Sequence, residues 1–242
     1  MKPSRSPSSP LLSPVRLSSL FRSQLWRGYL PKNPILMARK RPPTPPSKPW
    51  NSLEELKNDL LTCQRCTMCT ARKHALFGQG STQARLMVLT SPSPPSSPSQ
   101  EQPGQPLSQE SSELFNRMLS AIGLKREEIF LTPLVKCQTN PDRMPQREEI
   151  LTCLEHFEAE LRLVQPSVVV TLGEQATSQF IPSHLPFSET RGKFYSYSSV
   201  KILPTHHPDF LIAHPHAKKE SWMDLKRVAA ELNLTLPSSS SR

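Results

Sequence analysis

Short apolar segments alternate along this chain with longer segments in which apolar residues repeat at helical spacing. The short segments predict β-strands and the longer ones amphipathic helices, because side chains recur on one face every two residues in a strand and every three to four in a helix. The predicted strands are 86–89, 129–135, 167–172 and 200–203, and the predicted helices are 52–63, 111–122, 146–164, 174–180 and 217–233.

This alternation predicts an α/β fold: a three-layer α/β/α sandwich around a central, mostly parallel four-stranded sheet. Strand 167–172 reads Ser-Val-Val-Val-Thr-Leu and is apolar on both faces, so we expect it at the centre of the sheet. The loop 91–106 is rich in Pro and Ser and follows the first strand. Ligands of open α/β sheets bind at such strand ends.

The folded domain is expected to span residues 51–235. Ser52 and Glu55 have the spacing of a capping box, in which each side chain satisfies the other's free backbone donor at a helix start. Residues 1–50 are rich in Ser, Pro and basic side chains and are predicted to be a disordered tail, as are residues 236–242.

The net charge of +10 comes from the first fifty residues, which contain ten Lys or Arg and no acid. The other 192 residues carry twenty basic and twenty acidic side chains, so charge is weak evidence that the folded part binds nucleic acid. The tail fits three interpretations. It is an organellar transit peptide, a translated upstream region with the true start at Met37, or a basic tail with non-specific affinity for polyanions.

Localisation follows from the same segment. We expect a cytoplasmic bacterial protein, or an organellar one if roughly the first 36 residues are a transit peptide. No apolar run approaches the ~18 residues of a membrane helix, so no membrane association is expected.

Five cysteines form a constellation suited to a metal. Cys63 and Cys66 lie three apart at a predicted helix end, Cys137 closes a strand and Cys153 lies in the next helix. Four such thiols can close around a four-iron cluster or a tetrahedral zinc ion on folding, and spacing does not separate the two. The alternative is that these are free cysteines that fill core space. For Cys69 the two interpretations, metal ligand and core residue, are equally open.

Several sequence motifs resemble those of the iron–sulfur (family 4) uracil-DNA glycosylases, which are related to the amino-terminal part of some phage polymerases. The resemblance runs in order over about residues 52–232. The matching words are Cys-x-x-Cys at 63–66, Phe-Gly-x-Gly at 77–80, Met-Leu-x-Ala-Ile-Gly-Leu-x-Arg-Glu-Glu at 118–128, Val-Lys-Cys at 135–137, Glu-Glu-Ile-x-x-Cys at 148–153, Val-Thr-Leu-Gly at 170–173, Arg-Gly at 191–192 and Leu-Pro-Thr-His-His-Pro at 203–208.

The resemblance implies a uracil-DNA glycosylase-like fold and a set of site residues. His207 of the His207-Pro208 word would hydrogen-bond the uracil oxygen as charge builds on the leaving base. His206 and His214 receive no role. The implied partner is uracil-containing DNA, single- or double-stranded, and we expect a monomer. By the same resemblance a [4Fe–4S] cluster with a structural role would be ligated by Cys63, Cys66, Cys137 and Cys153.

Three positions of the implied base-binding pocket depart from the family. Its Gly-Glu-Ala-Pro-Gly word is replaced by Thr-Ser-Pro-Ser-Pro at 90–94, which puts Ser91 at the place of the Glu. Leu107 stands where a Phe stacks on uracil, and Pro133 where an Asn reads the edge of the base. Proline has no side-chain donor or acceptor, so the recognition of uracil is expected to suffer most there.

Two functions from different classes follow. The chain is a DNA-repair glycosylase that removes uracil or a related base, with weak or lost activity, because these three changes are expected to remove most uracil excision. Alternatively it is a non-catalytic nucleic-acid-binding or interaction protein that keeps the cluster and the fold.

Overall fold

The computed structural model describes residues 36–37, 50–91, 103–138, 144–181 and 185–237. The chain divides into the units 1–34 and 35–242, and all described residues lie in the second. Most of the predicted tail 1–50, the loop 92–102 and residues 238–242 thus lie outside the described residues. No described helix is both long and apolar enough to cross a bilayer.

Four parallel strands form the middle of the sheet, and all four were predicted: β4 (Leu86–Thr90), β5 (Phe130–Pro133), β7 (Val168–Leu172) and β9 (Val200–Thr205). The predicted centre, β7, lies between β4 and β9. Three short strands extend this core to seven in the order β1-β8-β9-β7-β4-β5-β3, so the predicted four-stranded sheet is its parallel part: β1 (Leu36–Met37), β3 (Gln79–Gly80) and β8 (Tyr195–Tyr197).

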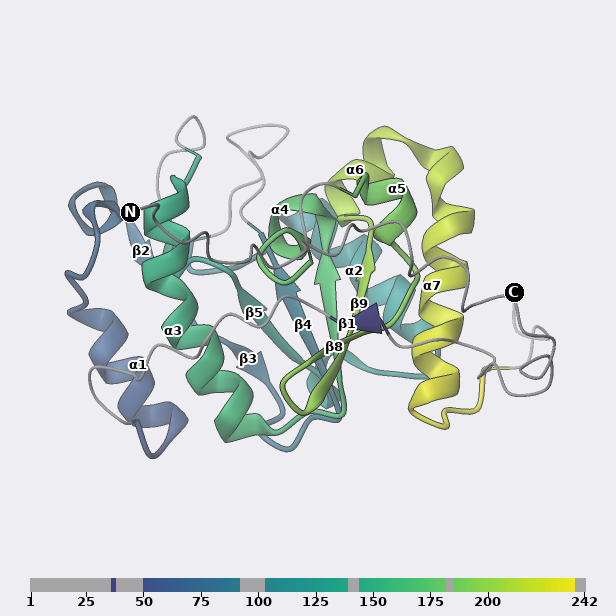
Figure 1. Cartoon of the computed structure of the whole chain (residues 1–242), viewed down its shortest axis with the longest axis horizontal. Coiled ribbons are helices and arrows are strands. Elements are labelled where there is room, and N and C mark those ends of the chain that lie inside the picture. The colour runs from purple at the N-terminus through teal and green to yellow at the C-terminus, as the bar shows by residue number, and fades with distance from the viewer. Residues whose placement is uncertain (1–35, 38–49, 92–102, 139–143, 182–184, 238–242) are drawn as a thin grey trace, which may run out of the picture. The chain divides into compact units, whose positions relative to one another are not determined.

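Helices cover both faces of the sheet, as predicted (Figure 1). Met87 and Leu89 of β4 face α3 (Arg147–Val164) and pack with Phe157, while Leu86 and Val88 face the opposite layer. That layer contains α2 (Gln109–Ala121) and α7 (Lys218–Glu231), which contribute Phe115 and Val228 to the second core cluster. Alternate β4 side chains therefore enter two separate cores, the arrangement of a three-layer sandwich.

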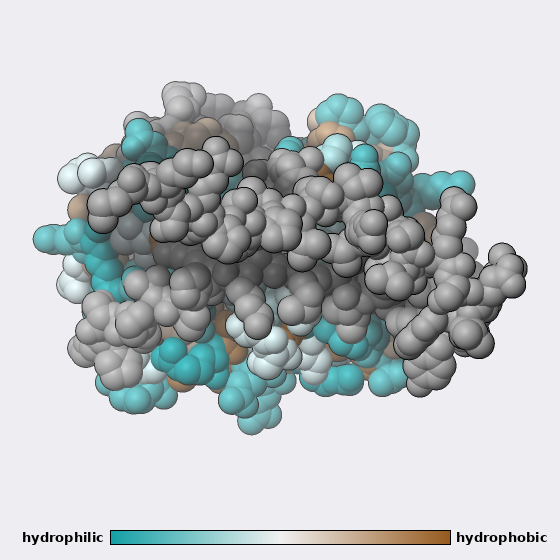
Figure 2. All heavy atoms as spheres, viewed as in Figure 1, coloured by the Kyte–Doolittle hydropathy of each residue, from teal (hydrophilic) through white to brown (hydrophobic). Residues whose placement is uncertain are grey.

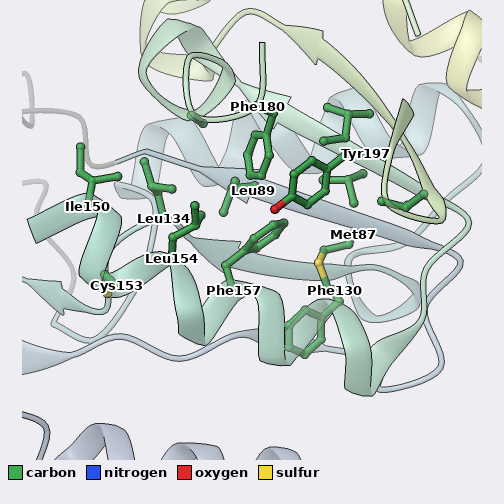
Figure 3. Packing of buried hydrophobic residues seen from close by; sticks show 14 of the residues in the cluster. Met87, Leu89, Phe130, Leu134, Ile150, Cys153, Leu154, Phe157, Phe180 and Tyr197 are labelled. Atoms are coloured by element: carbon green, nitrogen blue, oxygen red, sulfur yellow. The ribbon is translucent and has the colours of Figure 1, made fainter. Parts of the chain in front are cut away.

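The α3 side of the core is the more aromatic one. Phe157 of α3 lies 5.4 Å from the ring centroid of Phe180, and Phe180 lies 4.9 Å from that of Tyr197 on β8. Figure 3 shows these rings between α3 and the sheet, beside Met87 and Leu89. Edge-to-face contacts of this kind stabilise a core beyond the area they bury.

Two short helices were predicted with the right starts. Ser52 caps α1 (Leu53–Leu61) and accepts a hydrogen bond from the Glu55 amide, as predicted. The Glu55 carboxylate accepts from the Asn51 amide instead of the Ser52 amide, so the predicted capping box forms only in part. The helix expected at 174–180 is shorter and forms α4 (Gly173–Thr177). Three residues of the predicted tail belong to ordered structure: Leu36 and Met37 pair with β8, and Trp50 is buried.

Several small elements were not predicted from periodicity because each is too short to show one: the antiparallel pair β2 (His74–Ala75) and β6 (Cys137–Gln138), helices α5 (Phe187–Thr190) and α6 (Pro208–Ala213), and the 3₁₀ helices η4 (Thr67–Ala71), η6 (Arg126–Glu128) and η7 (Pro215–Ala217). The described surface in Figure 2 is mostly hydrophilic, with hydrophobic residues showing between hydrophilic ones.

Candidate functional site

A cavity lined by all five cysteines lies between α1, η4, β6 and α3. Its enclosed volume is about 10 Å³, roughly the space of one water molecule. The two cysteine pairs predicted to meet do meet, although they lie far apart in the chain. The thiol-bearing residues of the lining are Cys63, Cys66, Cys69, Cys137 and Cys153.

Burial sets the acid–base state of these thiols. It raises the pKa of Cys66 and Cys137, and it raises that of Cys153, the most deeply buried, to about 12. Arg72 opposes the effect at Cys137 through its charge and a hydrogen bond. Metal binding must therefore displace protons from these thiols, and the chain supplies nearby donors to the thiolates: the Lys136 amide donates to Cys153 Sγ at 3.2 Å.

The thiols line one cavity without forming a ready site for a single ion. Within the described ranges no three His, Cys, Asp or Glu side chains are close enough to hold one metal ion. Four-thiolate sets suit zinc and a four-iron cluster alike.

A buried ion pair connects the cavity to the sheet. Lys136, which lines the cavity, places its ammonium 2.7 Å from a Glu160 carboxylate oxygen of α3, and both side chains are 2% exposed. The Lys136 ammonium also donates to the hydroxyl of Thr132 on β5, and that hydroxyl donates to Glu160 at 2.6 Å. The pair thus ties the strand that ends at Pro133 to the helix that carries Cys153.

A second site lies at the carboxyl ends of the parallel strands. The register aligns Thr90 with Pro133 on one side and with Leu172 on the other, and Leu172 with Thr205. Gly173 follows with a φ of +82°, and a Cβ there would lie 3.3 Å from His207 Cβ and 3.9 Å from Ser91 Oγ. The missing side chain lets these segments approach closely. Three predicted site positions, Ser91, Pro133 and His207, therefore lie at one edge of the sheet.

His207 is held in one tautomer at this edge. Its Nδ1 accepts a hydrogen bond of 3.2 Å from the Asp209 amide, so the proton resides on Nε2, which lies 2.9 Å from Thr90 Oγ1. Burial lowers the pKa of His207, and Asp209 opposes this only in part. The imidazole is therefore neutral at pH 7 and donates from Nε2.

The other predicted positions support this edge from outside it. Leu107 is buried in the core cluster under α2, and Pro208 is the first residue of α6, where its missing amide leaves no unsatisfied donor. Ser111 of α2 donates to the Asp209 carboxylate.

Three contacts escaped prediction from the sequence. Thr90 becomes a neighbour of His207 only through folding, Asp209 contacts it through the local turn at the start of α6, and Cys69 joins the cavity through the turn of η4. Gly173 ends the family motif Val-Thr-Leu-Gly, and this motif was the sequence feature that pointed to Gly173 as a site residue.

Comparison with known families shows which family this chain belongs to. The family model of the Uracil DNA glycosylase superfamily matches residues 39–226. The chain belongs to this superfamily. The match spans the four parallel strands, the cysteine cavity and His207, so both sites lie within the shared region.

Similar proteins of the superfamily carry a more specific name. The chain is 28% identical over 194 residues to the type-4 uracil-DNA glycosylase of Saccharolobus solfataricus, covering 76% of this chain and 88% of that protein. It is 25% identical over 164 residues to the Thermotoga maritima type-4 uracil-DNA glycosylase, covering 66% and 83%. It is also 24% identical over 168 residues to the DNA polymerase of Bacillus phage SP01, covering 66% of this chain and 17% of the polymerase.

Proposed function

We propose that this superfamily member is a DNA-repair protein that binds DNA, carries a [4Fe–4S] cluster and removes uracil or a related base weakly or not at all. The observation that carries the proposal is the composition of the carboxyl edge of the sheet. His207 is fixed there as a neutral donor, but Pro133 offers the base edge no amide and Ser91 supplies no carboxylate. The similarity to uracil-DNA glycosylases supports DNA as the partner.

The cluster would be held by four thiolates that come from three parts of the chain. When bound, it would cross-link these segments and supply no redox step to base excision. The ligands follow the family resemblance, and Cys69 lines the same cavity as a fifth thiol. They are Cys63, Cys66, Cys137 and Cys153.

The chemistry at the carboxyl edge follows from the protonation of His207. In base excision the N-glycosidic bond breaks, its electron pair leaves with the base, and a water oxygen bonds to the sugar carbon and loses a proton. The Nε2 proton of His207 can stabilise the oxygen of the leaving base, and a donor of this type is worth about 10²–10³-fold in rate. The Ser91 hydroxyl cannot accept the water's proton as a carboxylate would, so position 91 supplies no base for the second half of the reaction.

A non-catalytic nucleic-acid-binding or interaction protein is the second candidate. The observation that favours it is the contact between His207 Nε2 and Thr90, which engages the imidazole donor within the chain itself. Under this alternative the fold and the cysteine cavity serve binding alone.

The deciding experiment is an excision assay on uracil-containing single- and double-stranded DNA, with iron quantified in the same preparation. We expect about four irons per chain and little or no uracil release. His207→Ala is the matched variant. The weak-activity proposal is contradicted if the natural chain releases uracil at rates ordinary for glycosylases and His207→Ala loses this activity. The cluster is contradicted if the protein contains zinc and no iron.

A further inference from the structure

Thr90 occupies an unusual place for a side chain at a base-binding edge. It ends β4, is fully buried at 0% exposed, and lies between β5 and β7. Its hydroxyl is 2.9 Å from His207 Nε2 and 3.2 Å from the Ser91 carbonyl oxygen. The residue therefore lies directly at the imidazole atom that is to serve as donor.

Counting protons fixes the direction of these hydrogen bonds. The Thr90 hydroxyl has one proton and donates it to the Ser91 carbonyl oxygen. Its bond to His207 must then run from Nε2–H to Oγ1, which agrees with Nδ1 accepting the Asp209 amide. Two independent contacts thus leave the imidazole no free donor.

We propose that Thr90 is a specificity-determining residue that occupies, with its own hydroxyl, the acceptor position at His207 Nε2 that a base oxygen would need. This inference rests on the proposed role of His207 as donor to the base. A base oxygen would reach Nε2 only after the Thr90 hydroxyl has left, and a glycine at this position, as in the word Gly-Glu-Ala-Pro-Gly, would leave the space empty.

The stiffness of threonine makes the block effective. Its χ1 has three staggered positions, and two of them place a heavy atom, Oγ1 or Cγ2, in any given direction from Cβ. Only one rotamer therefore clears the space in front of Nε2. The backbone cannot withdraw easily either, because the Leu134 amide donates to the Thr90 carbonyl oxygen at 2.7 Å within the sheet.

The test uses the full-length chain labelled with ¹⁵N and titrated with free uracil, with the His207 ring nitrogens observed by long-range ¹H–¹⁵N correlation. Thr90→Gly is expected to show a saturable uracil-dependent shift of Nε2, with affinity about fivefold to tenfold above the natural chain, the value of one hydrogen bond. Thr90→Ser keeps the acceptor and is the matched control. Thr90→Ala removes Oγ1 and Cγ2 while keeping Cβ, in case glycine destabilises the strand.

The outcomes separate this inference from the proposed function. If Thr90→Gly and Thr90→Ala keep the natural His207 tautomer and iron content but bind uracil no better than Thr90→Ser, the inference is wrong. It is also wrong if uracil shifts His207 Nε2 in the natural chain with the same affinity as in Thr90→Gly. A gain of the Nε2–uracil contact without base excision supports the inference and places the catalytic loss elsewhere. Excision by Thr90→Gly with no shift of Nε2 overturns both this inference and the role given to His207.

Discussion

The cysteine cavity and the carboxyl edge of the sheet belong to one fold but differ in how completely they match the family. The cavity holds every thiol that the resemblance assigns to the cluster, with one more beside them. At the carboxyl edge His207 is held in one tautomer, yet three of the positions that the resemblance assigns to the base carry other residues than the family's. A site that holds the fold together tolerates little change, whereas a site used only by substrate can change without unfolding the protein.

The physical basis of the difference lies in what each site contributes to the folded state. The cavity joins α1, β6 and α3, and the buried Lys136–Glu160 pair extends that connection to β5. At the carboxyl edge the altered side chains are themselves well packed: Leu107 lies in a core cluster, and Thr90 is hydrogen-bonded. Stability and base recognition are thus separable in this chain.

Loss of a cluster ligand is expected to have the largest effect. Cys153→Ser should abolish iron binding and solubility, because Cys153 is buried at 7% exposed and a structural metal contributes its binding energy to folding. Iron analysis with thermal unfolding checks this. Cys69→Ser is the matched variant, and the family resemblance predicts that it retains iron. Iron loss from Cys69→Ser and not from Cys153→Ser would reverse the ligand assignment.

Breaking the buried ion pair ranks second. Lys136→Met should lower the free energy of unfolding by about 3–5 kcal/mol, because it leaves the Glu160 carboxylate buried and unpaired. The control is Lys201→Met, which removes a half-exposed pair with Glu231 at 2.6 Å and should cost about 0–1 kcal/mol. Denaturant titration measures both. Equal losses would show that the connection between cavity and sheet adds no stability.

Rebuilding the carboxyl edge should restore activity jointly. Pro133→Asn, Leu107→Phe and the word Gly-Glu-Ala-Pro-Gly at 90–94 together are expected to raise uracil release by about 10²-fold or more above the product of the separate gains, because such residues act as a unit. Single-turnover excision assays on the combined and separate variants measure this. A gain of the combined variant equal to the product of the separate gains would mean that the positions act independently.

Removal of the basic tail tests whether the folded part binds DNA by itself. Deleting residues 1–50 removes the whole net charge of +10, so affinity for DNA at moderate salt should fall at least about tenfold and depend less on salt. Fluorescence anisotropy over a salt series gives both values. An unchanged affinity and salt slope would place the basic surface on the fold instead.

The smallest expected effect is the pH dependence that His207 imparts to stability. Burial lowers its folded-state pKa, so below the unfolded value of about 6.5 the unfolded chain binds a proton that the folded chain resists. Its contribution is complete above that pH and is lost as the pH falls toward the folded pKa. His207→Gln should flatten this part of the profile of unfolding free energy against pH. An unchanged profile would mean that the imidazole titrates alike in both states.

Much of the fold was predictable because it depends on sequence patterns within single elements. The four parallel strands, five of the helices and the Ser52 cap follow from apolar spacing and end signals that act over a few residues. The cysteine set was predictable as well, because a metal site needs particular side chains whatever their distance. Short elements such as α6 and β6 were missed, since β6 has only two residues and the six residues of α6 make fewer than two helical turns.

The sequence by itself determined the α/β class, the thiols available for a cluster, the confinement of net charge to the first fifty residues, and the proline at 133, where the family resemblance places an Asn. The tertiary structure alone decided that Thr90 meets His207, 117 residues away, and that Cys69 lines the cavity. The reason is strand register. Periodicity shows which face of a strand is buried, but only the pairing of β4 with β7 and of β7 with β9 sets which strand ends lie side by side.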